Sequence, residues 1–301
     1  MILRRGLPMA MMLVCCLFAG CKSSPGNAPA AGAMGPAEAT QLLARAVETR
    51  RSGDSILASG DMKIHDRASN FSLGMQIENF AAVYPDRMRL KTTKLAGTVD
   101  VFDALMRGDN IAFFVPRHNT LYTGKVSELR GGGLSFSPDR IVSRLLKGDR
   151  ALLDKKWTPL APAGGKNARG KNGAVEVEEV HQPGAEFLRV RLDPRRGTIA
   201  RIAYCDAHGA EYLVEEYDNY RDVDGGRNPG AGQLFPTRFN LLWPGQDRFV
   251  KINLKKADLS RRPEELAEAF EGIDGLDLER VQRKALGQAH IDSDPSTMQD
   301  E

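Results

Sequence analysis

The chain is poor in cysteine, and its cysteines are badly placed for a disulfide framework. It has four, of which Cys15, Cys16 and Cys21 lie in the first 21 residues and only Cys205 lies beyond them. An oxidising compartment permits disulfides, but one cysteine in the body of the chain cannot form an internal bridge. Thiol relay chemistry and cysteine metal sites are therefore not expected, and Cys205 is predicted to be a buried structural thiol.

An excess of charge of one sign is also lacking. The chain has 42 basic and 39 acidic residues and a formal net charge of +3. Two of the basic residues are Arg4 and Arg5, at the extreme N-terminus. A nucleic-acid-binding protein would show a strong basic excess or stripe. We therefore expect no nucleic-acid partner.

Long apolar runs are missing as well, since none reaches the ~20 residues that a membrane-spanning helix needs. The run from Met9 to Phe18 follows the basic pair and is followed by Ala19-Gly20-Cys21. A basic head, a short apolar middle and small residues before a cleavage point are typical of an export signal. Because it ends on cysteine, this stretch resembles a bacterial lipoprotein signal. The alternative is an ordinary secretory signal in which Cys21 occurs by chance.

The resemblance to lipoprotein signals implies a lipid anchor. Residues 1–20 would be removed, and Cys21 would carry a diacylglycerol and an amine-linked acyl chain such as palmitate. Fatty chains contribute ~0.8 kcal/mol of membrane binding for each buried methylene. Residues 21–36, rich in Pro, Gly, Ala and Ser, would form a flexible tether. Lys22 favours the outer membrane, facing the periplasm, while the inner membrane remains open.

A helix and then many strands are predicted for the body. From 37 to 50, Leu42, Leu43, Ala46 and Val47 share one face, with the spacing of an amphipathic helix. Beyond Ser55 the apolar residues alternate with polar ones, which is the strand pattern. Segments of this kind lie near 55–65, 71–77, 88–91, 99–101, 111–115, 121–122, 175–177, 188–192, 199–204, 212–217, 239–243 and 250–254.

One helix interrupts these strands. Ser137-Pro138 is a favoured helix start, and Gly148 can end the helix. Residues 157–173 are predicted to form a loop. Short helices are predicted for 263–270 and 276–286, within a helical extension at 257–289, and 290–301 is predicted to be disordered.

The fold class follows from the hairpins, which imply an antiparallel sheet. A twisted antiparallel sheet of this size should curl or close. We therefore predict a mostly β fold with some α: a large, curled antiparallel sheet, forming an incomplete, half-open β-barrel of about 11–12 strands covered by short helices.

The order of these elements resembles that of the LolA/LolB superfamily of outer-membrane lipoprotein-sorting proteins, over residues 37–256. Local sequence agrees at the turn Tyr84-Pro85-Asp86, at the apolar segment from Gly108 to Pro116 and at Phe235-Pro236-Thr237. Tyr84 stands where the soluble carriers tend to have an arginine, so their ligand-release mechanism is not transferred.

The resemblance implies an apolar cavity that holds acyl chains. Its expected wall is Phe71, Leu73, Met75 and Ile77, and its expected cover is the helix bearing Ile141, Leu145 and Leu146. Leu95, in the turn between Lys94 and Gly97, is a candidate contact with a membrane or a lipidated client. An alternating apolar stripe is also typical of packed core, so a filled core remains open.

Catalytic motifs are largely absent. The five histidines are scattered, with no pair at metal-ligand spacing. No Gly-x-Ser-x-Gly or Ser-x-x-Lys nucleophile motif stands where one would be expected. We therefore predict a protein that is not an enzyme and that needs no cofactor or metal.

Three functions remain open from the sequence. The favoured one is a lipid-anchored carrier or receptor for acyl chains of lipoproteins or of another envelope lipid. The second is a structural or interaction lipoprotein with a filled core, and the third is a hydrolase with an unrecognised site. The expected partners are a lipid or acylated lipoprotein client and the membrane, with a soluble carrier partner left open. The chain is expected to be a monomer.

Overall fold

The computed structural model describes residues 35–94, 97–129, 138–160, 174–223, 233–271 and 282–285. The predicted signal at 1–20, the lipidation site Cys21, most of the tether, Leu95 and the tail at 290–301 lie outside the described residues. Within the described part, no helix is long and apolar enough to cross a membrane.

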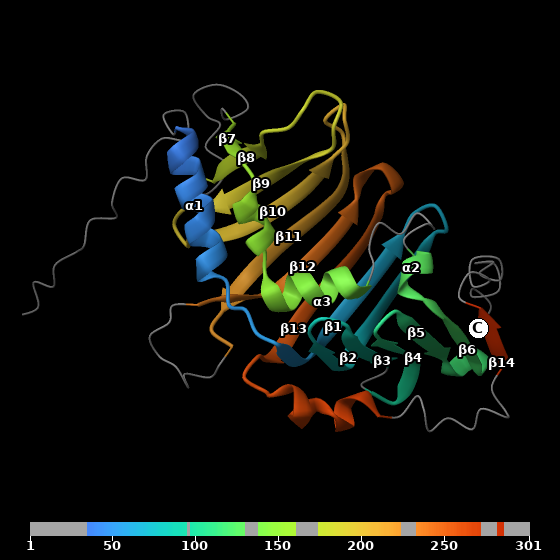
Figure 1. Cartoon of the computed structure of the whole chain (residues 1–301). Coiled ribbons are helices and arrows are strands. Elements are labelled where there is room, and N and C mark those ends of the chain that lie inside the picture. Colours follow the sequence, from blue (N-terminus) through green and yellow to red (C-terminus); the bar gives the residue numbers. More distant parts are fainter. Residues whose placement is uncertain are drawn as a thin grey trace, which may run out of the picture.

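A single sheet of 14 strands forms the body of the protein (Figure 1). Its strands are β1 (Ser55–Asp66), β2 (Phe71–Val83), β3 (Arg87–Lys94), β4 (Val99–Arg107), β5 (Asn110–Val115), β6 (Thr120–Lys125), β7 (Trp157–Pro159), β8 (Val175–Glu179), β9 (Phe187–Asp193), β10 (Thr198–Cys205), β11 (Glu211–Arg221), β12 (Phe235–Trp243), β13 (Arg248–Asp258) and β14 (Gln282–Ala285).

The helices are short. The α-helices are α1 (Pro36–Thr49), α2 (Val126–Leu129) and α3 (Pro138–Lys147). Single turns of 3₁₀-helix are η2 (Pro116–His118), η3 (Arg150–Asp154), η4 (Pro244–Gln246), η5 (Pro263–Leu266) and η6 (Glu268–Phe270). The predicted helices at 37–50 and after Ser137 are confirmed. α3 ends at Lys147, directly before Gly148, whose φ of 67° is in the left-handed region.

The order of the strands explains why the sheet is large but open. β1 to β6 follow one another on one side, and β13 down to β7 follow one another on the other side. The two halves meet where β1 pairs with β13, and all neighbours are antiparallel except β14, which is parallel to β6. β7 and β14 are therefore free edges, and the predicted half-open antiparallel barrel is confirmed.

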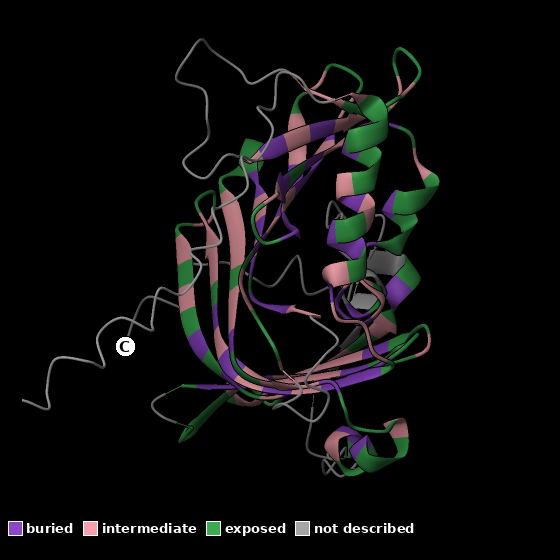
Figure 2. Ribbon diagram, turned by 90° about the vertical axis from the view of Figure 1, so that its left-hand side faces the viewer, coloured by how far each residue is buried: buried purple, intermediate pink, exposed green. Residues whose placement is uncertain are grey.

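The sheet curls around α1 and α3, which lie on its concave side (Figure 2). We call this the inner face. α1 packs on β7, β9, β10 and η3, while α3 packs on β2 and β3. Ala39, Leu43, Ala46 and Val47 of α1 are buried, which is the apolar stripe predicted from the sequence.

Strand register places one apolar set on the inner face across five strands. Met75, Met62, Ile252, Phe239 and Tyr217 are successive cross-strand partners on β2, β1, β13, β12 and β11. Because side chains alternate between faces, the stripe Phe71, Leu73, Met75 and Ile77 belongs to this inner set. The predicted wall residues therefore share the concave face.

The outer face is covered in part by the C-terminal segment. Leu266 and Phe270, of η5 and η6, pack against Ala81, Leu105 and other apolar residues of β2, β4 and β6. Arg107 also donates a hydrogen bond to the carbonyl oxygen of Phe270 at 2.9 Å. The C-terminal segment thus shields apolar side chains that the curled sheet leaves outside.

Two short edge strands differ from the sequence prediction. Trp157–Pro159 is the edge strand β7, although it lies in the predicted loop. Trp157 is buried, and its indole N–H donates to the carbonyl of Leu152 at 2.9 Å. Gln282–Ala285 is the strand β14, where a helix was predicted; it satisfies the backbone groups of β6, which would otherwise be an open edge.

Candidate functional site

A cavity of about 520 Å³ lies between the inner face of the sheet and the segment formed by α3 and η3. Ligand pockets usually measure ~300–1,000 Å³. The strands supply an apolar wall that includes Ile77, Phe80, Leu90, Phe239, Leu241 and Ile252. Leu145 of α3 and Ala151 of η3 face this wall from the cover. The cavity is therefore a mainly apolar space with room for a small ligand.

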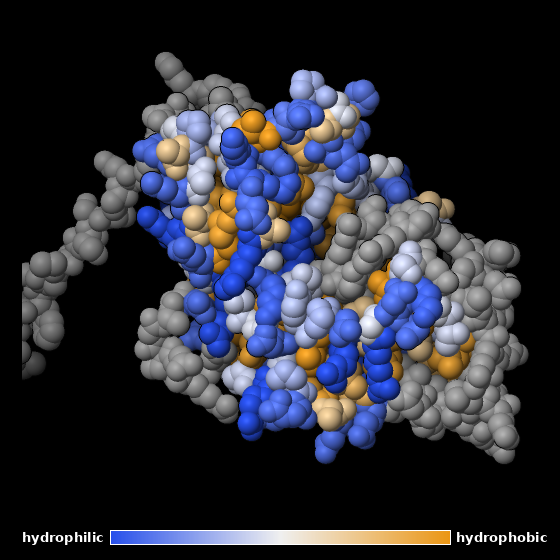
Figure 3. All heavy atoms as spheres, viewed as in Figure 1, coloured by the Kyte–Doolittle hydropathy of each residue, from blue (hydrophilic) through white to orange (hydrophobic). Residues whose placement is uncertain are grey.

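Part of this apolar wall remains accessible. Leu90, Leu188, Tyr212 and Ile252 line the cavity and are only partly buried. In the view of Figure 3, apolar side chains gather in a hollow beside α1 and are framed by polar ones. The inner face is thus not completely filled by its own side chains and those of α1 and α3.

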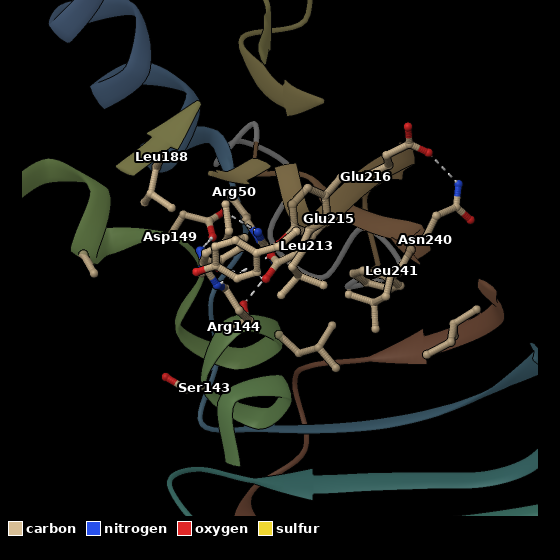
Figure 4. A pocket seen from close by; sticks show the side chains of 18 of the residues that line it. Arg50, Ser143, Arg144, Asp149, Leu188, Leu213, Glu215, Glu216, Asn240 and Leu241 are labelled. Carbon is tan, nitrogen blue, oxygen red and sulfur yellow. Dashed lines mark hydrogen bonds and ion pairs between the residues drawn. The ribbon is translucent and has the colours of Figure 1, made fainter. Parts of the chain in front are cut away.

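One end of the cavity carries a set of linked polar side chains, which we call the buried polar cluster. It joins α1, α3, the turn after α3, β10 and β11 (Figure 4). Its members are Arg50, Arg144, Asp149, Tyr204, Glu215 and Tyr217.

Asp149 is the centre of the first half of the cluster. It is 1% exposed, and it accepts hydrogen bonds from Arg50 and, at 2.7 Å, from Arg144. The other terminal nitrogen of Arg50 donates to the carbonyl oxygen of Arg144 at 3.0 Å. The Arg50 guanidinium also lies 4.7 Å from the centre of the Tyr217 ring, a cation–π contact. These contacts tie the end of α1 to the end of α3.

Glu215 is the centre of the second half. Its carboxylate accepts hydrogen bonds from the hydroxyls of Tyr217 and, at 2.9 Å, of Tyr204. Arg144 lies 3.6 Å from the same carboxylate and also donates to the Tyr204 hydroxyl. The second half therefore fixes α3 to the inner face of β10 and β11.

The electrostatics keep Asp149 ionised and the two tyrosines of the cluster protonated. Burial by itself would raise the pKa of Asp149, but Arg50 and Arg144 outweigh it and hold that pKa below the usual range. Burial, and next the charge of Glu215, raise the pKa values of Tyr204 and Tyr217, so both hydroxyls stay protonated and donate. Two guanidinium groups and two acidic side chains thus contact each other beside an apolar cavity.

The residues predicted for the ligand site fall in different places. Ile77 and Leu145 line the cavity. Met75 and Leu146 are buried in the main core cluster, and Leu73 packs against it. Phe71 is partly buried at the start of β2, outside the cavity lining. The side chain of Ile141 and the whole of Leu95 lie outside the described residues. Their roles in ligand binding stay predictions.

The residues of the buried polar cluster were not predicted. Arg50 and Asp149 are 99 positions apart, and no spacing rule pairs them. Only Glu215 could have been noticed from the sequence. It lies two residues from Leu213 and two from Tyr217 in β11, so it shares their inner face, where a buried carboxylate needs partners. Among the described residues, no group of three or more His, Cys, Asp or Glu is placed to hold a metal ion.

Comparison with known proteins gives similar structures but no sequence relative. No family model matches the chain, and no curated protein matches it. A domain described as an outer membrane lipoprotein-sorting protein from Vibrio parahaemolyticus has 13% identity and a TM-score of 0.47, covering 78% of this chain and 97% of its own.

Two further structures are similar to the same degree. A LolA superfamily protein from Nitrosomonas europaea has 12% identity and a TM-score of 0.46, covering 80% of this chain and 100% of its own. A DUF1329 family protein from Desulfovibrio piger has 12% identity and a TM-score of 0.49, covering 80% of this chain and 99% of its own. One of these similar structures is thus described as a member of the LolA superfamily, which the sequence resembles. The half-open barrel itself is established by the strand order of this chain.

Proposed function

We propose that this protein binds the acyl chains of an amphiphile, either a lipoprotein or another envelope lipid, in the cavity of its inner face. A lipid on Cys21 would hold it in the cell envelope, at the outer membrane facing the periplasm. The role is binding without catalysis, by a monomer. The observation that carries the proposal is the mainly apolar cavity of about 520 Å³ beneath α3.

The energetics favour an acyl ligand. Each methylene moved from water into an apolar space contributes ~0.8 kcal/mol. Leu188 and Ile252, which line the cavity, keep part of their surface exposed, and an acyl chain would cover that surface. The charges of the buried polar cluster are already compensated, so the chain, rather than a charged head, would supply most of the binding energy.

A cavity-filling substitution tests this proposal. Leu188→Trp takes the space of about two methylenes, so we expect about tenfold weaker binding of a fluorescent fatty acid. The matched control is Leu242→Trp, because Leu242 is also partly buried but packs on the outer face. The measurement is a titration of the unlipidated chain 22–301, which keeps every described element.

The control should bind within about twofold of the wild type, since an outer-face change leaves the cavity intact. Circular dichroism and thermal unfolding check that both variants are folded. If the wild type binds no fatty acid, or if both variants lose binding equally, the cavity is not the ligand site.

A further inference from the structure

A second depression lies on the outer face, on the side of the sheet opposite the cavity. This outer groove, of about 520 Å³, crosses β2, β1, β13 and β12 and reaches Lys94 at the end of β3. It is lined mainly by outer-face residues and also touches Met62, Met75 and Ile252 of the inner set. Its lining includes four basic residues, Lys63, Lys94, Arg238 and Lys251, but one acidic residue, Asp61. Side-chain amides complete its polar lining. The groove is therefore a basic surface on an otherwise nearly neutral chain.

Two of these lysines face each other directly. Lys63 on β1 and Lys251 on β13 are cross-strand partners, and like charges in such positions destabilise a sheet. The next residues along the same row are Gly74 on β2 and Asn240 on β12, which bring no negative charge. The fold thus brings two ammonium groups together without a carboxylate at the next position of the row on either side.

The nearby carboxylates are already engaged. Asp61 pairs with Lys255 at 2.9 Å, and Asp218 pairs with Arg238 at 3.3 Å. The carboxylate at the far end of the row, on Glu216, accepts a hydrogen bond from Asn240 at 3.1 Å. The repulsion between Lys63 and Lys251 is therefore left for a molecule outside the chain to relieve.

Phe249 keeps the two ammonium groups near each other. The Nζ atoms of Lys63 and Lys251 lie 5.9 and 4.6 Å from the centre of its ring. His65 stacks on the same ring at 4.9 Å. Both lysines are exposed, so the positive charge is presented outward from the centre of the outer face.

We propose that the outer groove docks the protein on an anionic phospholipid surface, with a lipid phosphate between Lys63 and Lys251. The basic side chains lie on β3, β1, β13 and β12, within a run of five neighbouring strands. A layer of headgroups offers phosphates to several of them at once. Basic clusters bind anionic membranes in this way. The cavity, on the opposite face, would then point away from the bilayer. This proposal does not depend on what the cavity binds.

The test is sedimentation of the unlipidated chain 22–301 with vesicles. Equal parts phosphatidylglycerol and phosphatidylethanolamine supply the anionic surface, and phosphatidylcholine alone supplies the neutral one. We expect binding to the anionic vesicles only, and its loss at 1 M salt, where the Debye length is ~3 Å. Lys63→Gln combined with Lys251→Gln should weaken that binding about fivefold or more.

The control combines Lys125→Gln with Lys156→Gln, which removes the same charge from exposed positions elsewhere. It should keep most of the binding. The proposal is overturned if both double variants lose vesicle binding equally, or if the wild type does not bind anionic vesicles. It is also overturned if the wild type binds inorganic phosphate but not vesicles. Fatty-acid binding should be unchanged in Lys63→Gln/Lys251→Gln, so failure of the groove and failure of the cavity are distinguishable.

Discussion

Replacing Asp149 by alanine should lower the free energy of unfolding by about 3–5 kcal/mol, the usual cost of removing one partner from a buried ion pair. Asp149 is the common partner of Arg50 and Arg144, and the Arg50 side chain is 1% exposed. Without the carboxylate, a buried guanidinium loses its counter-charge and α1 loses its link to α3. Urea or guanidinium unfolding, monitored by circular dichroism, measures the change.

Asp154→Ala is the matched control, because Asp154 lies in the adjoining η3 turn but is exposed. Surface substitutions of this kind usually change stability by less than ~0.5 kcal/mol. An Asp149→Ala protein as stable as the control would show that the buried polar cluster does not support the fold.

The same substitution should change the response to acid. Arg50 and Arg144 hold the pKa of folded Asp149 below its usual range despite burial, whereas an unfolded aspartate titrates near ~3.9. The stabilisation is therefore present above pH ~4 and is lost as the pH falls through the folded pKa. The wild type should lose more stability than Asp149→Ala between neutral and strongly acidic pH.

Replacing Gly60 by alanine should cost about 3 kcal/mol, at the upper end of the range for overpacking. A Cβ at Gly60 would lie 2.1 Å from the carbonyl oxygen of Asn253 and 2.8 Å from the Cα of Leu254. Both atoms belong to the backbone of β13, which cannot rotate away as a side chain can. The pairing of β1 with both neighbours also shifts register at this glycine.

Gly74→Ala is the matched control on the neighbouring strand. A Cβ at Gly74 meets nothing within 4 Å, and the residue is exposed. Replacing a strand glycine without strain stabilises a protein by ~0.4–1 kcal/mol through the unfolded state. Equal stability of Gly60→Ala and Gly74→Ala, measured by denaturant unfolding, would contradict the close approach of β1 and β13.

Period-two patterns predicted most of the sheet because inner-face residues such as Met62, Met75 and Ile252 recur at every second position. The helices α1 and α3 were equally readable, from the apolar face of the first and from Ser137-Pro138 and Gly148 around the second. β7 and β14 were missed because strands of three and four residues are too short to show a period.

The site was harder to predict because it depends on contacts between distant residues. Arg50, Asp149 and Glu215 come together only after α3 folds back over the inner face. The residues of the predicted wall stripe lie on the inner face, but Ile77 lines the cavity whereas Met75, two residues before it, does not, although both are buried. The curvature of the sheet and the position of α3 decide this difference, and neither is encoded in a local pattern.

Native mass spectrometry of the unlipidated chain, purified from bacteria without detergent, tests the proposed acyl-binding cavity most directly. We expect a bound species with the mass of a phospholipid or an acylated peptide, lost in Leu188→Trp and retained in Leu242→Trp. A folded wild-type chain that carries no ligand and takes up no added fatty acid would contradict acyl binding and favour an interaction lipoprotein with a filled core.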